Sequence, residues 1–414
     1  MTNRFEVAVE SIAAGGDGVA RANGLVVFVP RSAPGDVGIV DVAPRGSFAR
    51  SEFAELLASS PQRVTPPCPH YTMDKCGGCQ LQHIEYSSQL AAKSRIVTDA
   101  FRRIGARIVS EPEVSPSADQ WRYRRKLTLA LRRRGQWWTA GLHPYDDPGR
   151  IFPVDDCPIT HESVISVWRE VLSASSDFPY ARELRGSVRL SLNTASFTLE
   201  GGNRWPNSGV FFDRVPSLTT LWWQKSRRER RLLHERPDGG VRAPGASFTQ
   251  VNAGVAADLQ ARVVDLTLQH EPRTVVDAYS GLGDLAVGIA ERQPAVEVCA
   301  IEMDVDAAAW TTRRLRVGSR CLVGRVENLL PQALPADVII LNPPRAGVDS
   351  RVTDTLVQTS PAPRAIIYVS CDPATLARDV RRLDRFRIAS LQLFDMFPQT
   401  AHVETVCELV PGAP

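Results

Sequence analysis

The alternation of apolar and polar positions divides the chain into four stretches. Residues 1–62 contain short apolar runs separated by turns rich in Gly, Asn and Asp. Runs of this length between turn residues are typical of strands, so we expect a compact β-barrel there. Residues 63–90 are rich in cysteine. Residues 91–244 mix an amphipathic helical pattern with strand-like segments, which predicts a central α+β domain.

Residues 245–414 alternate strand-like and helical patterns. Apolar runs at 274–280, 296–302, 336–342 and 364–370 are each followed by a loop and a helical stretch. This rhythm predicts an α/β fold, with an open parallel sheet covered by helices on both faces. Ligands of such sheets bind at the carboxyl ends of the strands. The polar motifs of this segment lie at or just beyond those ends.

Composition adds little to this picture. The chain has 414 residues, 43% of them hydrophobic, which is enough for two or three domains. It has no apolar run of about 18 residues, so no transmembrane helix is expected, and the charged N-terminus predicts a cytoplasmic protein.

The net charge is only +3, but basic residues concentrate at 121–134 and 225–236. Such runs are most often solvated faces, and alone they favour a nucleic-acid partner only weakly.

A glycine-containing turn after the first of these strands is a candidate cofactor loop. Asp277 ends the strand, Gly281 and Gly283 follow, and Glu302 ends the next strand. The glycines allow close approach of the backbone to a ligand, and an acid at the second strand end usually binds ribose hydroxyls. A dinucleotide site would read Gly-x-Gly-x-x-Gly, whereas Asp-x-x-x-Gly-x-Gly is typical of S-adenosylmethionine sites. A tight turn without a ligand is the structural alternative.

Cys371 is the candidate nucleophile. It closes a buried strand and precedes Asp372-Pro373, where a helix is expected to begin. A lone cysteine is usually a small buried hydrophobe, but a helix N-terminus favours the reactive thiolate. A thiolate that adds to carbon 6 of uracil makes carbon 5 nucleophilic toward an electrophilic methyl group. A general base must then remove the proton from carbon 5, and Glu404 is the candidate.

Cysteines also indicate a metal or cluster site. Cys68, Cys76 and Cys79 lie close together, and Cys157 is the best placed fourth ligand. Four thiolates suit either zinc or a 4Fe-4S cluster, and the spacing does not choose between them.

These motifs resemble those of the RNA uridine-5-methyltransferases that carry an iron–sulfur cluster, a family that includes 23S ribosomal RNA enzymes and archaeal transfer-RNA relatives. Ser370-Cys371-Asp372-Pro373 and the residues up to Asp379 are similar to the nucleophile motif, and 402–405 to the general-base motif. The resemblance implies a TRAM-type RNA-binding barrel at 1–62. It implies a 4Fe-4S cluster held by the four cysteines named above. It also implies methyl transfer from S-adenosyl-L-methionine to carbon 5 of a uridine in RNA, with 23S rRNA favoured and tRNA possible.

The resemblance assigns further site residues. Trp121-Arg122-Tyr123-Arg124-Arg125-Lys126 is similar to a stretch with RNA contacts, and Phe248 falls where an aromatic ring faces the base. The residues implied to contact the cofactor are Gln250, Asp277, Tyr279, Gly281, Asp284, Glu302, Asn328 and Asn342. The expected assembly is a monomer with RNA as its partner and no membrane.

Asn342 departs from the family pattern, which has Asp before Pro-Pro-Arg or Pro-Ala-Arg. Asn-Pro-Pro is also the signature of methyltransferases that act on exocyclic amines, where an aromatic residue normally follows. Here Arg345 follows. Arg345 in place of an aromatic residue, together with Cys371, favours methylation of carbon. A methyltransferase that acts on an exocyclic amine, which would not need Cys371, is the alternative enzyme. A non-catalytic RNA-binding factor is the alternative of a different class.

Overall fold

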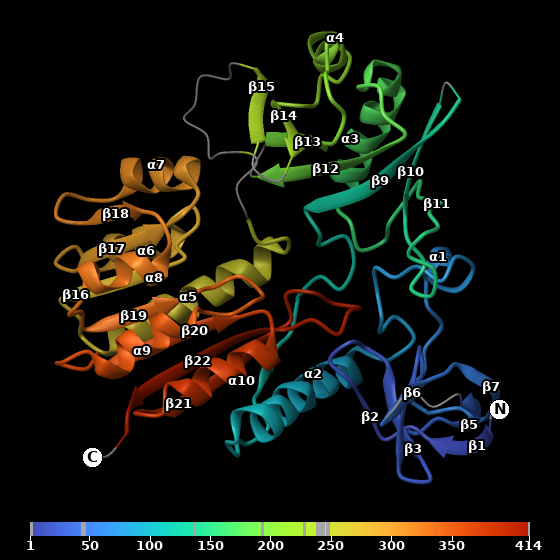
Figure 1. Cartoon of the computed structure of the whole chain (residues 1–414), viewed down its shortest axis with the longest axis horizontal. Coiled ribbons are helices and arrows are strands. Elements are labelled where there is room, and N and C mark those ends of the chain that lie inside the picture. Colours follow the sequence, from blue (N-terminus) through green and yellow to red (C-terminus); the bar gives the residue numbers. More distant parts are fainter. Residues whose placement is uncertain are drawn as a thin grey trace. The chain divides into compact units, whose positions relative to one another are not determined.

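The computed structural model describes residues 3–42, 47–135, 137–191, 194–226, 229–236, 245 and 249–412. The chain forms two compact units (Figure 1). Unit 1 comprises Met1–Pro66, Cys79–Ala118 and Gly254–Pro414, and unit 2 comprises Pro67–Gly78 and Asp119–Ala253. Residues 91–118 therefore pack with unit 1, whereas the sequence pattern groups them with the central domain. None of the helices in these described ranges is long and apolar enough to cross a membrane.

The N-terminal part of unit 1 is all-β, as expected. Its strands form two small sheets, ordered β1-β5-β7 and β2-β3-β4-β6. Val7, Val27 and Val40 belong to the apolar core that the strands of both sheets share. The TRAM-like character of this part stays a prediction. The strands are β1 (Asn3–Ala8), β2 (Ser11–Ile12), β3 (Gly18–Ala22), β4 (Leu25–Val29), β5 (Val37–Val42), β6 (Phe48–Arg50) and β7 (Phe53–Ala58).

The rest of unit 1 is built on an eight-stranded sheet ordered β18-β17-β16-β19-β20-β22-β21-β8. The four strands predicted from apolar runs are confirmed as β16, β17, β19 and β20, and they are parallel, as expected. The sheet is not parallel throughout, because β22 runs antiparallel to both of its neighbours. A short link between β21 and β22 can only reverse the chain direction. The strands are β8 (Val114–Ser115), β16 (Thr274–Ala278), β17 (Glu297–Glu302), β18 (Arg320–Val323), β19 (Val338–Leu341), β20 (Ala365–Ser370), β21 (Phe386–Phe394) and β22 (Glu404–Pro411).

Helices cover both faces of this sheet because successive strand residues point to opposite sides. Val275 and Ile340 belong to a core shared with α5 and α6, whereas Val276 and Ile339 belong to a core shared with α2, α9 and α10. The amphipathic helical pattern of this region corresponds to α2 and a following π-helical turn at Phe101–Gly105. The helices are α2 (Tyr86–Ala100), α5 (Ala253–Gln269), α6 (Asp284–Arg292), α7 (Val305–Arg314), α8 (Val326–Leu329), α9 (Ser350–Gln358) and α10 (Pro373–Arg382), with 3-10 turns at Leu330–Ala333.

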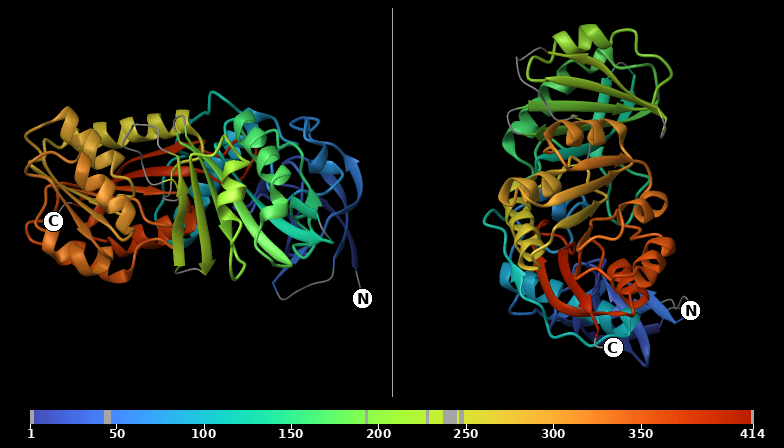
Figure 2. Two further views of the ribbon diagram at one scale, coloured as in Figure 1. Left: turned by 90° about the horizontal axis from the view of Figure 1, so that it is seen from above. Right: turned by 90° about the vertical axis from the view of Figure 1, so that its left-hand side faces the viewer.

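Unit 2 is an α+β layer structure, as predicted for the central segment. Its seven-stranded sheet is ordered β11-β10-β9-β12-β13-β14-β15. Helices α3 and α4 pack on one face, where Trp168 and Phe211 join the core (Figure 2). The strands are β9 (Lys126–Arg134), β10 (Trp137–Leu142), β11 (Phe152–Pro153), β12 (Glu183–Ser191), β13 (Thr194–Glu200), β14 (Thr220–Ser226) and β15 (Glu229–Glu235). The helices are α1 (Pro69–Thr72), α3 (Glu162–Ser173) and α4 (Ser208–Asp213), with a 3-10 turn at Ser175–Asp177.

Candidate active site

The candidate cofactor loop lies at the carboxyl ends of two neighbouring parallel strands of unit 1. Glu302, at the end of β17, accepts hydrogen bonds from the backbone N–H groups of Gly281 at 2.8 Å and Asp304 at 2.7 Å. Gly281 and Gly283 adopt φ values of 56° and 75°. A Cβ on Gly283 would lie 2.4 Å from the side chain of Thr311. This turn therefore requires glycine at 283 for space as well as for backbone conformation.

Asp277 has a different environment from the one expected for a ligand-binding acid. It is fully buried, and its Oδ2 accepts a hydrogen bond from the Ala286 N–H of α6 at 3.1 Å. Burial raises the pKa of Asp277 to about 7. Its Oδ1 and the hydroxyl of Ser280 are buried polar atoms without a hydrogen-bond partner within the described ranges. Buried polar atoms of this kind need an explanation, and a polar ligand in the loop would satisfy them.

The other residues expected to contact the cofactor are distributed around this loop or lie outside unit 1. Asp284 accepts from Arg314 Nη1 at 2.8 Å, and Asn328 accepts from Arg351 Nη1 at 3.2 Å. Tyr279 lies in the loop with a φ of 63°, and the Asn342 N–H donates to the Ala278 carbonyl at 3.2 Å. Gln250 belongs to unit 2, and Phe248 lies outside the described residues.

Strand register brings Cys371 and Glu404 together. β20 and β22 pair antiparallel, and the last pair of the ladder is Ser370 with Thr405. One further step along this register places Cys371 opposite Glu404. Residues directly opposite in an antiparallel ladder have Cβ atoms about 4.5–5.5 Å apart. The two residues that sequence motifs assign separately to nucleophile and base are therefore neighbours at one end of the sheet.

The electrostatic environment of this pair is set by burial and by Arg345. Burial raises the pKa of the Cys371 thiol, as does the nearby Glu404 carboxylate, whereas Arg345 lowers it through its charge and a hydrogen bond. Burial raises the pKa of Glu404 to about 8, and Arg345 opposes that shift. Burial therefore disfavours the thiolate form of Cys371 and the carboxylate form of Glu404. Arg345 is the positive group that favours their reactive forms.

In the sequence, Arg345 stands out only as the residue that replaces an aromatic one after Asn-Pro-Pro, and the α10 N-terminus is predicted to favour the thiolate. In the structure, Asp372 caps α10 and accepts from the N–H groups of Ala374 at 3.0 Å and Thr375 at 2.9 Å. Burial is the main reason that the pKa of the Cys371 thiol is raised. The signal for Arg345 was its position directly after Asn-Pro-Pro at the end of β19.

A buried polar network holds residues 395–403, which we call the base loop because they lead into Glu404. The side chains of Lys93 and Asp395 are fully buried and pair at 2.5 Å, and the Tyr86 hydroxyl donates to Asp395 at 2.8 Å. Gln399 has a φ of 68°. Its N–H donates to Gln89 Oε1 at 3.0 Å, and its Oε1 accepts from Gln89 Nε2 at 3.0 Å. Helix α2 therefore anchors the base loop at two points.

The Gln399 carbonyl provides a third anchor for the base loop. It accepts from the backbone N–H groups of Gln80 at 3.1 Å and Leu81 at 3.0 Å. The segment directly after Cys79 is thus tied to the approach to Glu404.

The stretch expected to contact RNA has structural contacts within unit 2. Arg122 pairs with Asp156 through two hydrogen bonds of 2.6 and 2.7 Å and also donates to the Cys157 carbonyl. Tyr123 is buried, and the Arg124 and Arg125 backbones bond to residues 159 and 251. Burial lowers the pKa of Lys126 to about 8. These contacts within unit 2 give the stretch a structural role there.

Three of the four clustered cysteines belong to unit 2. Cys68 and Cys76 are buried, and Cys157 is half-buried. Burial raises the pKa of Cys68, and the neighbouring Cys157 and Asp156 add to the shift. The Gly78 N–H donates to Cys76 Sγ at 3.4 Å, a contact of the kind that supports cluster thiolates. Cys79, also buried, follows Gly78 in the chain and is assigned to unit 1. Across the described part of the chain, no group of three His, Cys, Asp or Glu side chains is arranged to hold a metal ion.

Known proteins resemble the chain over nearly its whole length. It is 32% identical over 443 residues to an uncharacterized RNA methyltransferase of Protochlamydia amoebophila, covering 98% of this chain and 97% of that protein. A family model described as tRNA (Uracil-5-)-methyltransferase matches residues 317–410, which include Cys371 and Glu404. The chain belongs to the RNA (uracil-5-)-methyltransferase family. This RNA (uracil-5-)-methyltransferase uses S-adenosylmethionine as its methyl donor.

Two further proteins extend the comparison. An uncharacterized RNA methyltransferase of Halalkalibacterium halodurans is 30% identical over 450 residues, covering 98% of this chain and 96% of its own. The crystal structure of a Pyrococcus abyssi tRNA (uracil-54, C5)-methyltransferase with S-adenosyl-L-homocysteine superposes with a TM-score of 0.73. It is 24% identical and covers 98% of this chain and 99% of its own. That likeness shows that the methyltransferase shares its fold.

Proposed function

We propose that this RNA (uracil-5-)-methyltransferase acts through a covalent adduct between Cys371 and carbon 6 of the target uridine. The observation that supports the proposal is the pairing of Ser370 with Thr405 at the end of the β20–β22 ladder, after which Cys371 and Glu404 are the next residues of the two segments. A nucleophile and a base that act on adjacent ring atoms must lie side by side, and this register provides that arrangement.

Each group has a defined task. The Cys371 thiolate forms a bond to carbon 6, and the ring electrons move to the carbonyl oxygen at carbon 4 and make carbon 5 nucleophilic. Bound S-adenosylmethionine supplies the electrophilic methyl group. The Glu404 carboxylate then takes the proton from carbon 5, the carbon 5–carbon 6 double bond re-forms, and the thiolate leaves. Arg345 favours the charged forms that Cys371 and Glu404 need for these steps.

The residues of the cofactor loop suit S-adenosylmethionine. Among the described residues, Asp277 Oδ1 and the Ser280 hydroxyl have no hydrogen-bond partner and can bind polar groups of a ligand. Glu302 ends the strand where an acid can bind ribose. We assign Tyr279, Gly281, Asp284, Asn328 and Asn342 to the same site, with Gln250 assigned from its motif alone.

Two substitutions test the mechanism because they must fail at different steps. Cys371→Ala cannot form the enolate, so neither methylation nor an adduct is expected. Glu404→Gln can add and methylate but cannot eliminate, so it should accumulate protein bound to methylated RNA. A denaturing gel with labelled RNA should show a slow band for Glu404→Gln only. Full turnover by Cys371→Ala would overturn the proposal and favour the amine methyltransferase reading of Asn342.

The RNA target is proposed separately from the mechanism. We favour 23S rRNA, with tRNA as the second candidate, because the motifs resemble both groups of enzymes. Mass-spectrometric mapping of 5-methyluridine in RNA from a deletion strain identifies the target. Loss of a 5-methyluridine from tRNA alone would reject the 23S assignment. A cytoplasmic, monomeric protein with a TRAM-type RNA-binding domain at 1–62 fits either target and stays part of the proposal.

We also propose a 4Fe-4S cluster held by Cys68, Cys76, Cys79 and Cys157. The proposal rests on the family-like motif, on the proximity of Cys68 to Cys157, and on the N–H···S contact at Cys76. No reaction step depends on it. Anaerobically purified protein should be brown, with about four irons per chain. Stoichiometric zinc without visible absorbance would contradict the cluster.

A further inference from the structure

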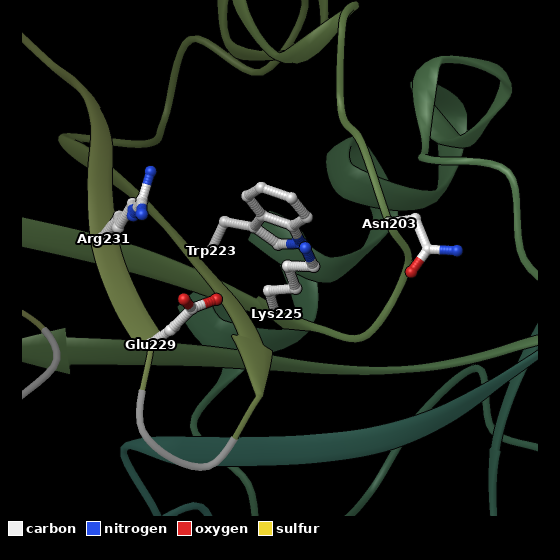
Figure 3. A pocket seen from close by; sticks show the side chains of 5 residues that line it. All are labelled: Asn203, Trp223, Lys225, Glu229 and Arg231. Atoms are coloured by element: carbon white, nitrogen blue, oxygen red, sulfur yellow. The ribbon is translucent and has the colours of Figure 1, made fainter.

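The edge hairpin of unit 2 carries a pocket of about 230 Å³ that none of the motifs accounts for. β14 and β15 pair antiparallel, with Trp223 opposite Arg231. The register is irregular between Gln224 and Ser226, and Lys225 and Glu229 line the same pocket as Trp223 and Arg231. Figure 3 shows the indole of Trp223 in the middle of the pocket, with Arg231 and Glu229 to one side and Asn203 to the other.

The Trp223 ring is held by its polar edge. Its Nε1 donates to the Gly201 carbonyl at 2.8 Å, so the only polar atom of the indole is satisfied. The ring packs at the margin of the unit 2 core and is partly buried. A rigid aromatic ring in a pocket needs little ordering to accept a flat partner, whereas a mobile side chain would lose entropy.

Exposed charges surround this ring. Lys225, Glu229 and Arg231 are all exposed, and they lie within the basic run at 225–236. Two cations beside an aromatic ring match the components of a single-stranded nucleic-acid site, in which bases stack on rings and cations track the backbone. Glu229 can accept a hydrogen bond from a base amino group or a ribose hydroxyl.

We propose that this pocket binds one unpaired nucleotide of an RNA, with its base stacked on Trp223 and the flanking phosphates at Lys225 and Arg231. The proposal rests on the proposed RNA substrate. It extends RNA contact to a site in unit 2 that is distinct from the stretch at 122–126. Double-stranded RNA offers no unstacked base, so the site should distinguish single strands from duplexes.

Binding of a labelled 12-nucleotide oligouridine, measured against the matching duplex, tests the proposal on the full-length protein. Trp223→Ala should weaken binding of the single strand by about 5- to 150-fold, the range for removal of one base stack. Trp223→Phe should retain most of the affinity. Tyr180→Ala removes an exposed ring outside the pocket and is the control that should leave binding unchanged.

A second variant separates stacking from charge. Lys225→Ala/Arg231→Ala should lower the slope of log affinity against log salt by about 1.4, since each single-strand phosphate that is no longer neutralised lowers it by about 0.7. Unfolding midpoints identify a variant that fails to fold. Unchanged affinity of a folded Trp223→Ala protein, or an equal decrease for single strand and duplex, would refute the nucleotide site. Methylation of RNA by the wild type is scored separately, and its absence would reject the proposed substrate and not this pocket.

Discussion

The cofactor loop and the base loop of unit 1 are held in place in opposite ways. The cofactor loop, residues 277–284, is held mainly by contacts with α6, β17 and α7, the elements that follow it directly in the chain. The N–H of Gly281 bonds to Glu302, the N–H of Ala286 bonds to Asp277, and Thr311 fills the space beside Gly283. The base loop depends on α2, whose Lys93 meets Asp395 across 302 residues of sequence. One loop is local, and the other is assembled from distant segments.

This difference predicts how each loop responds to change. Damage to the cofactor loop should stay local and weaken cofactor binding. Damage to the anchors of the base loop should affect folding or the final chemical step, because these anchors also join α2 to the sheet.

The largest effect is expected from Lys93→Met. It leaves the Asp395 carboxylate buried without its cation, which costs about 3–5 kcal/mol of unfolding free energy. Chemical denaturation measures the loss. Lys75→Met is the matched control, since Lys75 forms an exposed pair with Asp146 at 2.9 Å and should cost no more than about 1 kcal/mol. Similar losses for both variants would show that the base loop has no special anchor.

Gly283→Ala should break the cofactor loop. The new Cβ would meet Thr311 at 2.4 Å at a φ of 75°, and strain of about 1–3 kcal/mol should weaken S-adenosylmethionine binding by about 5- to 150-fold. Calorimetry measures the change. Gly281→Ala has a positive φ but open space around its Cβ, so it should weaken binding less. An equal effect of the two would assign the loss to backbone strain alone.

Gln89→Met tests whether the base loop positions Glu404. The variant removes both side-chain hydrogen bonds to Gln399, and a small displacement of the base should slow elimination by about 10-fold. The covalent RNA adduct should then accumulate, as for Glu404→Gln but incompletely. S-adenosylmethionine affinity should not change, because the cofactor loop is held separately. A slower reaction without more adduct would place the defect before elimination.

The smallest effect expected is a shift of the pH profile in Arg345→Met. Arg345 lowers the pKa values of Cys371 and Glu404, so its loss should raise both. The reaction needs the thiolate and the carboxylate, so activity should rise with pH through about 8 in the wild type and at still higher pH in the variant. Single-turnover rates between pH 6 and 9.5 measure the shift. Arg345→Lys keeps the charge and should lie closer to the wild type.

Glu404→Gln offers a check on the sign of these shifts. A buried carboxyl whose pKa is raised from 4.5 to about 8 contributes stability that is present at low pH and lost as the pH rises through that window. Glutamine does not titrate, so the stability of the variant relative to that of the wild type should rise as the pH rises from 5 to 8. A stability difference that does not change with pH would contradict the raised pKa.

The sequence predicted the features that depend on local patterns. The buried strands β16, β17, β19 and β20 were identified because each is a continuous apolar run between turn residues. The cofactor loop was identified because its glycines and acids follow these strands directly. Cys371 and Glu404 were singled out by their motifs, but their proximity follows from the strand pairing of β20 with β22, which neither motif contains.

Features that depend on distant pairing were not predicted. The insertion of β22 antiparallel between β20 and β21 has no local signal. An apolar run predicts a strand, but it does not show whether that strand pairs parallel or antiparallel. The anchoring of the base loop by α2 also depends on a distant partner and has no local signal. Lys93 appears as an ordinary charge on an amphipathic helix, and only Asp395 explains its burial. The helix terminus beside Cys371 is visible in the sequence, whereas the burial that raises the pKa of its thiol is not.

The interleaving of the two units also has a consequence for how the chain is made. Lys93 leaves the ribosome 302 residues before Asp395, which at about 5–20 residues per second is roughly 15–60 s earlier. Throughout that interval the Lys93 ammonium group has no Asp395 carboxylate to pair with, because Asp395 has not yet been synthesised. The long segment of unit 2 is synthesised within the same interval and can fold first. The sheet of unit 1 can therefore be completed only after β21 and β22 have been synthesised.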